Sequence, residues 1–265
     1  MSAPLYVQVL GIGLLGPGLA DWASGAPRLR DPATWQRTPT QVPAPSRLPP
    51  TERRRAGTVV KASIVVADQA CAAAGADPAA LASVFASSTG EPANCHALCE
   101  ALATPERLVS PTRFTNSVHN AAGGYWHIAT RSTMPSTSLG AYDGSFGAGL
   151  LEAAAQCIAG GAPVLLVACD VPYPEPLHAL RPLADVFGVA LVLGPDTGRG
   201  ARLALQACAD GRPSACADAG LEALRRSIPA ARALPLLGAL AAQRAGRLQL
   251  EWLPDLSLQT ELEFR

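Results

Sequence analysis

A carboxylate stands at the turn that would join a strand to a helix near the middle of the chain. The stretch "PSTSLGAYDGSF" (135–146) reads as a short β-strand, a glycine-containing turn and the start of an apolar-periodic helix. Many enzymes carry a nucleophile at such a turn, and here that position holds Asp143. The pattern indicates either a site with different chemistry or a site that has lost its nucleophile. Asp143 would also serve as a helix N-cap, because the positive end of the helix dipole favours an acidic side chain.

A second set of side chains indicates hydrolytic or acyl-transfer chemistry. His119 and His127 are eight residues apart in a segment with helical spacing, so we expect them to share one helix face. With Asp143 and a hydroxyl such as Ser145, His119 would supply the parts of a catalytic triad, provided that the groups lie within hydrogen-bond distance. As a pair the two histidines would also suit a ligand pair or a proton relay, and the alternative is that both are core or interface residues satisfied by their neighbours.

The cysteines predict packing rather than metal chemistry. The chain has seven, an odd number, and several lie in apolar segments, where a free thiol behaves as a small hydrophobe. Cys95 and Cys99 flank His96, but no second ligand pair follows at zinc-site spacing, so we expect no metal. Cys157 falls on the apolar face of the helix after Asp143 and is expected to pack in the core. We expect no bound cofactor.

Charge and hydropathy argue against a nucleic-acid-binding protein and against a secreted or membrane-spanning one. The 21 basic and 21 acidic side chains cancel, whereas non-specific nucleic-acid binding needs a net basic surface. Arg53, Arg54 and Arg55 form one dense basic patch, interpreted as a solvated face or as a docking spot for a small acidic partner. The N-terminus lacks the basic region of a signal peptide, and no apolar run is long enough to span a bilayer. We therefore expect a cytoplasmic protein with reduced thiols.

Alternating strand-like and helix-like segments predict an α/β layered fold. The expected strands are 5–18, which ends in a Gly/Pro turn, 82–90, 135–139, 162–171, 187–194, 202–208, 247–253 and 257–264. The expected helices are 19–25, 58–76, 94–104, 118–132, 145–161 and 219–243, the last broken by Pro229 and Pro235. Residues 26–56 are rich in Pro and Arg and read as an irregular excursion. The run 162–171 is continuously apolar, as in a strand buried on both faces, and the helix 145–161 should bury Phe146, Leu150, Leu151, Ala154, Cys157 and Ile158.

In order and spacing, these segments resemble the N-terminal half of a β-ketoacyl synthase, a protein of thiolase fold. "VQVLGIGLLGPG" and the Trp-containing helix after it are similar to the family's opening "V-x-I-T-G-x-G-x-x-S-P-x-G", and "LASVFASSTGE" is similar to its next strand. The family has a stretch that leads to its catalytic cysteine in "S-x-x-T-A-C". This sequence resembles that stretch, with matching residues at the same spacing: Ser110-Pro111, Asn120, Gly124 and Pro135. "CIAGGAPVLLVACD" and "FGVALVLG" look like two later segments, so the resemblance covers roughly residues 5–195.

The resemblance places the family's cysteine at position 143. Asp143 is a poor acyl acceptor there, because an acyl anhydride would hydrolyse. The family also uses two histidines and a lysine from its C-terminal half to stabilise the enolate and the oxyanion. Beyond position 143 this sequence has only His178, in an unrelated context, and its single lysine is Lys61. The resemblance therefore implies a homologue that does not catalyse condensation by itself.

The same resemblance implies a paired subunit. Ketosynthases dimerise through the strand before the nucleophile and its neighbouring helix, and small residues in "NAAGGYWHIA" and "GSFGAGLLEAAA" would permit close helix approach. The chain is similar to the chain-length factors of type II polyketide systems and to ketosynthase-like proteins of aryl polyene pigment clusters. The expected partner is a catalytic ketosynthase, served by an acyl carrier protein, in polyene, polyketide or fatty-acid-type elongation. The expected tunnel or interface residues, of which Trp126 or Tyr142 would stop chain growth, are Phe114, Asn120, Tyr125, Trp126, Tyr142 and Phe146.

Two other functions stay open from the sequence. One is a small acyltransferase or hydrolase that uses Asp143 and His119, and the other is a monomeric module that binds an acyl carrier protein through the arginine patch at 53–55. As to organisation, the resemblance implies a thiolase-like fold truncated in its C-terminal half. Residues 1–200 would form the ketosynthase-like part, and residues 201–265 a short degenerate part packed on the same domain.

Overall fold

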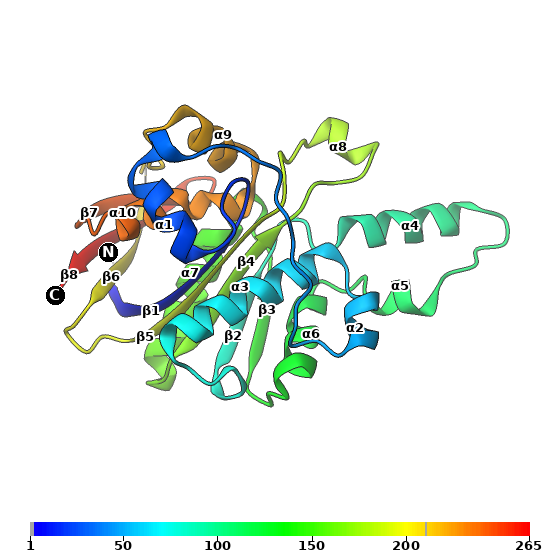
Figure 1. Cartoon of the computed structure of the whole chain (residues 1–265), viewed down its shortest axis with the longest axis horizontal. Coiled ribbons are helices and arrows are strands. Elements are labelled where there is room, and N and C mark those ends of the chain that lie inside the picture. Colours follow the sequence, from blue (N-terminus) through cyan, green and yellow to red (C-terminus); the bar gives the residue numbers. More distant parts are fainter. Residues whose placement is uncertain (1–2, 210) are drawn as a thin grey trace.

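The computed structural model describes residues 3–209 and 211–265, which form one mixed β-sheet with helices on both faces (Figure 1). The strands lie in the order β3-β2-β4-β5-β1-β6-β8-β7. β2 pairs in parallel with β3 and with β4, whereas the other neighbouring pairs are antiparallel. The strands are β1 (Leu5–Leu15), β2 (Ala82–Ala86), β3 (Ser136–Leu139), β4 (Val164–Asp170), β5 (Phe187–Pro195), β6 (Ala201–Ala209), β7 (Gly246–Leu253) and β8 (Leu256–Phe264).

Two helical layers enclose the sheet. α3 and α6 pack on one face, and α7, α10 and the 3₁₀ helix η4 pack on the other. None of the helices in the described part of the chain is long and apolar enough to cross a membrane. The helices are α1 (Trp22–Arg30), α2 (Pro50–Arg55), α3 (Thr58–Ala74), α4 (Pro92–Ala103), α5 (Pro111–Thr115), α6 (Ala121–Thr130), α7 (Ser145–Gly160), α8 (Leu177–Leu180), α9 (Ala219–Ser227) and α10 (Leu234–Ala241), with 3₁₀ helices η1 (Pro32–Thr34), η2 (Pro78–Ala80), η3 (Tyr142–Gly144) and η4 (Pro229–Ala233).

The sheet separates two hydrophobic cores, one under α7 and one under α3. β4, the strand expected to be buried on both faces, contributes to both. All of its residues are buried, and successive side chains point to opposite faces. Val164, Leu166 and Ala168 enter the core under α7, and Leu165, Val167 and Cys169 enter the core under α3. This arrangement confirms the α/β layers that the alternating segments predict.

The last two strands form a hairpin at one edge of the sheet. In β8, Leu258, Thr260 and Leu262 are buried, and the residues between them are partly exposed, as the alternating pattern predicts. β6 joins this hairpin to β1, so the sheet runs without a break through the expected division at residue 200. The division into a ketosynthase-like part (1–200) and a degenerate part (201–265) stays a prediction.

Small residues fix α7 against this hairpin. A methyl group added at Gly144 would lie 1.8 Å from the carbonyl oxygen of Trp252, and one at Gly147 would lie 2.2 Å from that of Glu251. Gly149 would clash with Ala86 in β2 in the same way. The glycines of "GSFGAGLLEAAA" therefore serve contacts within the chain, and a pairing role for this segment stays a prediction.

Three expected elements differ from the structure. The excursion 26–56 contains ordered helix, because α1 continues to Arg30 and α2 occupies Pro50–Arg55. Ile158, expected in the core, is 43% exposed, since it lies at the margin of the buried face of α7. The segment 219–243 is divided into α9, η4 and α10, and Pro235 stands in the first turn of α10, where proline is tolerated.

Candidate functional site

Asp143 lies in η3, the 3₁₀ turn between β3 and α7. The residue before it, Tyr142, has a φ of 50°, a left-handed conformation that bulky residues seldom adopt. Ser145 closes the turn, because its Oγ donates to the carbonyl oxygen of Tyr142 at 2.7 Å and accepts from the N–H of Ala141 at 3.0 Å. Gly144 occupies the N-cap position of α7. The expectation that Asp143 caps this helix is therefore wrong.

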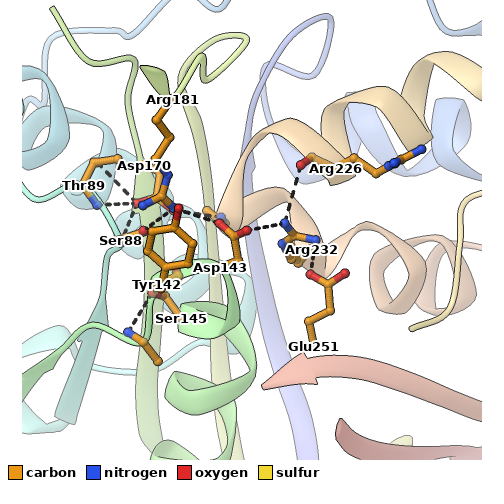
Figure 2. A network of polar contacts seen from close by, with 12 residues as sticks. Ser88, Thr89, Tyr142, Asp143, Ser145, Asp170, Arg181, Arg226, Arg232 and Glu251 are labelled. Carbon is orange, nitrogen blue, oxygen red and sulfur yellow. Dashed lines mark hydrogen bonds and ion pairs between the residues drawn. The ribbon is translucent and has the colours of Figure 1, made fainter. Parts of the chain in front are cut away.

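The carboxylate of Asp143 instead lies between two arginines (Figure 2). Oδ1 is 2.8 Å from Nη2 of Arg181, and Oδ2 is 3.1 Å from Nη2 of Arg232. The Asp143 side chain is 45% exposed, whereas that of Arg232 is only 10% exposed. Because both oxygens contact guanidinium groups, the carboxylate acts as an ion-pair partner for two separate segments rather than as a free acyl acceptor.

Arg181 connects the excursion that carries α8 to this turn. Its Nη2 also donates to Ser88 Oγ at 2.9 Å, in the loop after β2. The guanidinium lies over the ring of Tyr142, 3.6 Å from the ring centroid, and 5.9 Å from that of Tyr173. Such a cation–π contact adds to the ion pair and orients the exposed ring of Tyr142. Arg181 therefore brings together η3, α8 and the loop after β2.

Arg232 extends the network to the C-terminal hairpin. It forms an ion pair with Glu251 of β7, and Glu251 also lies 3.1 Å from Nη1 of Arg225 in α9. Arg225 in turn contacts Glu222 at 2.7 Å, and its hydrogen bond is the main reason that the pKa of Glu222 lies below its usual value. The alternating charges thus join η3, η4, β7 and α9.

Asp170 is a polar residue of the core that the sequence analysis missed. It ends β4 and is completely buried. Its Oδ1 accepts from the N–H groups of Ser88 and Thr89 at 2.7 and 3.1 Å, and its Oδ2 accepts from that of Ala230 at 2.8 Å. Burial raises the pKa of Asp170 although these donors act in the opposite direction. The signal in the sequence was an aspartate that ends an otherwise apolar strand.

A cleft of about 440 Å³ opens beside Asp143. Tyr142 and Asp143 form one wall, and the turn of the β7–β8 hairpin forms the other, with Trp252, Leu253 and Leu256. The contacts of Gly144 and Gly147 with β7 hold the two walls together. The position of the expected nucleophile is therefore open to solvent, but its charged side chain is engaged by arginines.

The triad of the alternative function does not form among the described residues. Nε2 of His119 lies 3.0 Å from the carbonyl oxygen of Ser87, and Ser145 makes the turn contacts given above. His119 also precedes α6, which begins at Ala121, whereas His127 lies within the helix. The expectation that the two histidines share a helix face is therefore wrong, because the helical spacing begins after His119.

The expected tunnel residues divide into exposed and buried groups. Phe114 is 66% exposed, and Asn120 and Tyr142 are also exposed. Trp126 is 0% exposed and packs with Tyr125 in the core under α3, where the Tyr125 hydroxyl donates to Asn116 Oδ1 at 3.0 Å. Phe146 is buried in the other core. These buried rings present no surface in the isolated chain, so the role of Trp126 in stopping chain growth stays a prediction.

The cysteines and the arginine patch lie elsewhere. Cys157 is buried in the core, and burial raises the pKa of its thiol. Cys95 and Cys99 are exposed on α4, where His96 contacts Glu100 at 3.3 Å. Within the described residues, no group of three His, Cys, Asp or Glu side chains is placed to hold a metal ion. The arginine patch forms the last turn of α2.

Comparison with known proteins identifies a family and a fold. A model of the family described as beta-ketoacyl synthase, N-terminal domain, matches residues 27–249. No curated protein matches the chain. Among solved structures, a ketosynthase (ApeO) in complex with its chain length factor (ApeC) from Xenorhabdus doucetiae is similar with a TM-score of 0.75 at 20% identity, over 97% of this chain and 99% of that one.

Two further complexes show the same likeness. The ishigamide ketosynthase/chain length factor has a TM-score of 0.69 at 15% identity, over 99% of each chain. The type II polyketide complex AntDE:AntF, an acyl-carrier protein with its ketosynthase bound to the hexaketide, has a TM-score of 0.72 at 12% identity, over 100% of each chain. These likenesses confirm the thiolase-like α/β fold expected from the sequence.

Proposed function

The chain belongs to the beta-ketoacyl synthase, N-terminal domain family, and from this premise we propose that it is a non-catalytic subunit. In this proposal it pairs with a catalytic ketosynthase, as a chain length factor does, and helps to shape the acyl tunnel of the complex. The partner supplies the nucleophile and the histidine and lysine side chains, and an acyl carrier protein delivers the growing chain.

The observation that carries the proposal is the state of Asp143. The position expected for the nucleophile holds a carboxylate whose two oxygens are bound by Arg181 and Arg232. A side chain fixed in this way stabilises the fold but offers no free nucleophile. The missing histidine and lysine positions support the same conclusion, because the chain's single lysine, Lys61, is in α3 and not in a C-terminal segment.

The edge strand β3 supplies the proposed pairing surface. β3 pairs with β2 on one side and ends the sheet on the other. The carbonyl oxygens of Pro135 and Leu139 accept from the N–H groups of Ser83 in β2 and of Ser87 just after it. The alternation of a parallel ladder therefore directs the N–H and C=O groups of Ser136 and Ser138 to the open edge. Such an edge accepts a strand from a second chain.

A cleft beside this edge leaves room for a partner helix. It has a volume of about 440 Å³ and is lined by α6 and β3 residues that include Asn120, Gly124, His127 and Ser138. A methyl group built on Gly124 would meet no described atom within 4 Å outside its own turn of helix, so this glycine is not required by packing against other elements. Gly124 would instead permit close approach of the partner.

Phe114 is the residue that we propose to limit chain growth. It belongs to α5, which packs on α4, and Figure 1 shows this helical pair extending away from the sheet. Leu102 and Leu108 on the same extension are also exposed. Apolar side chains on an extension without a core of its own would be covered by the partner, where the Phe114 ring would form part of the tunnel wall.

The arginine patch of α2 is the proposed contact for the acyl carrier protein. Arg54 and Arg55 line a cleft of about 470 Å³ together with Arg113 of α5. Arg55 contacts Glu52 at 3.5 Å and Glu91 also lines the cleft, so the three arginines still outnumber these two acidic side chains. A positive cleft attracts an acidic protein at low ionic strength and loses that attraction as salt is added.

Three open glycines test the pairing surface. Gly124, Gly160 and Gly238 all lie in helices where an added methyl group meets no described atom within 4 Å. We expect Gly124→Leu to abolish co-purification with the ketosynthase, because the leucine fills the cleft next to β3. Gly160→Leu and Gly238→Leu, which change the same residue type elsewhere, should leave the complex intact. If the Gly124→Leu variant retains the complex, β3 and the cleft beside it are not the pairing surface.

A further inference from the structure

A second cleft lies beside α9, apart from Asp143 and its two arginines. It has a volume of about 250 Å³ and is enclosed by α1, α10, the start of α9, β7 and residues 215–218. It shares no lining residue with the cleft beside Asp143. Its volume is below the range of about 300–1,000 Å³ that is usual for drug-sized ligands, so it suits a narrow molecule.

Gly238 indicates that this space is kept open. It stands in the middle of α10, where glycine costs about 0.5–1 kcal/mol of helix stability relative to alanine. Glycine within a helix usually has a packing reason, but a methyl group at Gly238 would meet no described atom within 4 Å outside its own turn. Because Gly238 lines the cleft, the missing side chain enlarges the cleft rather than relieving a clash.

Part of the lining of the cleft is apolar. Leu29, Leu221 and Leu234 form its floor and are themselves buried in the core under α7. The Cys216 thiol contributes to the wall, and burial raises its pKa to about 12, so this group stays uncharged at neutral pH. These walls would bind an aliphatic chain through the hydrophobic effect.

The charges that line the cleft are mainly positive. Arg30 donates through Nε to the carbonyl oxygen of Ala241 at 2.9 Å, which holds its guanidinium beside the end of α10. The Arg244 side chain makes no ion pair or hydrogen bond with the described residues. Among the described residues, one acidic side chain lines the cleft, that of Asp218, which accepts from the N–H of Leu221 at 2.9 Å and caps α9. An anionic head group would therefore be bound by the two arginines.

We propose that this cleft is a binding site for a single-chain aliphatic carboxylate, such as a medium-chain fatty acid. The alkyl chain lies along the leucines beside Gly238, and the carboxylate contacts Arg244 and Arg30. The site is distinct from the proposed pairing surface, because no β3 residue is among its described lining residues, and its link to the Asp143 network is the hydrogen bond from the N–H of Cys216 to Glu222 at 2.9 Å.

The test uses octanoate, octanol and octylammonium as probes, with calorimetric titration of the full chain. We expect octanoate to bind, and the neutral and cationic probes to bind at least about tenfold more weakly because they lack the negative charge. Arg244→Gln should weaken octanoate about tenfold and leave octanol unchanged. Octanol binding as tightly as octanoate would refute the role of the arginines, and no binding of octanoate would refute the site.

Gly238→Leu provides the second variant. The Cβ of the leucine would meet no described atom within 4 Å outside its own turn, and leucine adds helix propensity, so we expect the protein to remain as stable as the parent. We expect this variant to lose octanoate binding and Gly160→Leu, at an open position of α7, to keep it. Equal octanoate affinity of both variants would overturn the proposal.

Discussion

Asp143 binds two arginines that reach it from distant parts of the chain, and this arrangement explains an acidic residue at the turn before α7. Arg181 comes from the α8 excursion and Arg232 from η4. Removal of the carboxylate would leave the largely buried Arg232 paired with Glu251 alone. The cost of a broken ion pair rises steeply with burial, so most of the effect should come from Arg232.

The first prediction concerns the stability that Asp143 provides. Asp143→Asn should lower the free energy of unfolding by about 1–2 kcal/mol, a value between those of exposed and buried ion pairs. Urea unfolding measures this difference. Asp255→Asn is the matched control, because Asp255 lines the same cleft but makes no ion pair with described residues. Equal stability of the two variants would contradict the role given to Asp143.

The second prediction uses Asp143→Cys. A thiol at this position would lie beside two guanidinium groups and the start of α7, both of which lower a thiol pKa. We expect the introduced thiol to react with iodoacetamide at pH 7 at least about tenfold faster than that of Cys95, whose pKa is raised by the partial burial of its thiol. Peptide mass spectrometry after timed alkylation gives both rates in one sample. Equal rates would show that the arginines do not act on this position.

At the residue scale, the sequence identified position 143 as unusual but did not identify Arg181 and Arg232 as the partners of Asp143. The turn at Asp143 follows from its place between a strand and a helix, and the packing of Cys157 follows from the helical period of the apolar residues. Both are local patterns. The pairs of Asp143 with Arg181 and Arg232, and the bonds of Asp170 to the loop after β2, join residues remote in sequence. No spacing rule predicts such contacts, since they depend on how the sheet places the loops.

At the scale of elements, the contact between α7 and β7 gives the third prediction. In most helices Gly→Ala adds stability, by up to about 1 kcal/mol. At Gly147 the sign should reverse, because the new methyl group would lie 2.2 Å from the Glu251 carbonyl oxygen, and overpacking of this kind costs about 1–3 kcal/mol. Thermal unfolding should show a lower Tm for Gly147→Ala. Gly160→Ala, on the same helix without such a contact, should keep or raise the Tm.

The elements themselves were largely predictable. β4 and β8 follow from a continuous apolar run and from alternation, and α3 ends at Gly75 in the left-handed conformation. α2 was missed because "PTERRR" has no apolar periodicity, and its proline start and acidic first turn are weak signals by themselves. The sheet order could not be derived, since the pairing of β1 with both β5 and β6 is a tertiary property.

At the scale of the whole molecule, the buried and exposed aromatic residues should behave differently. Trp126→Ala should lower the free energy of unfolding by about 3–5 kcal/mol, because it leaves a cavity in a close-packed core. Phe114→Ala should change stability by less than about 0.5 kcal/mol, since the ring is 66% exposed.

In the reconstituted complex, Phe114→Ala should shift the products to longer chains, as mass spectrometry of the products would show. An unchanged product profile with an intact complex would refute Phe114 as the residue that limits length.

The open β3 edge, the extended α4–α5 pair and the occupied Asp143 position all favour a subunit that works in a complex (Figure 1). The most direct test is co-expression of the tagged chain with the ketosynthase encoded nearest to it, followed by native mass measurement of the purified material. We predict a one-to-one complex of the two chains. A stable monomer or homodimer that does not bind the ketosynthase would contradict the proposed function.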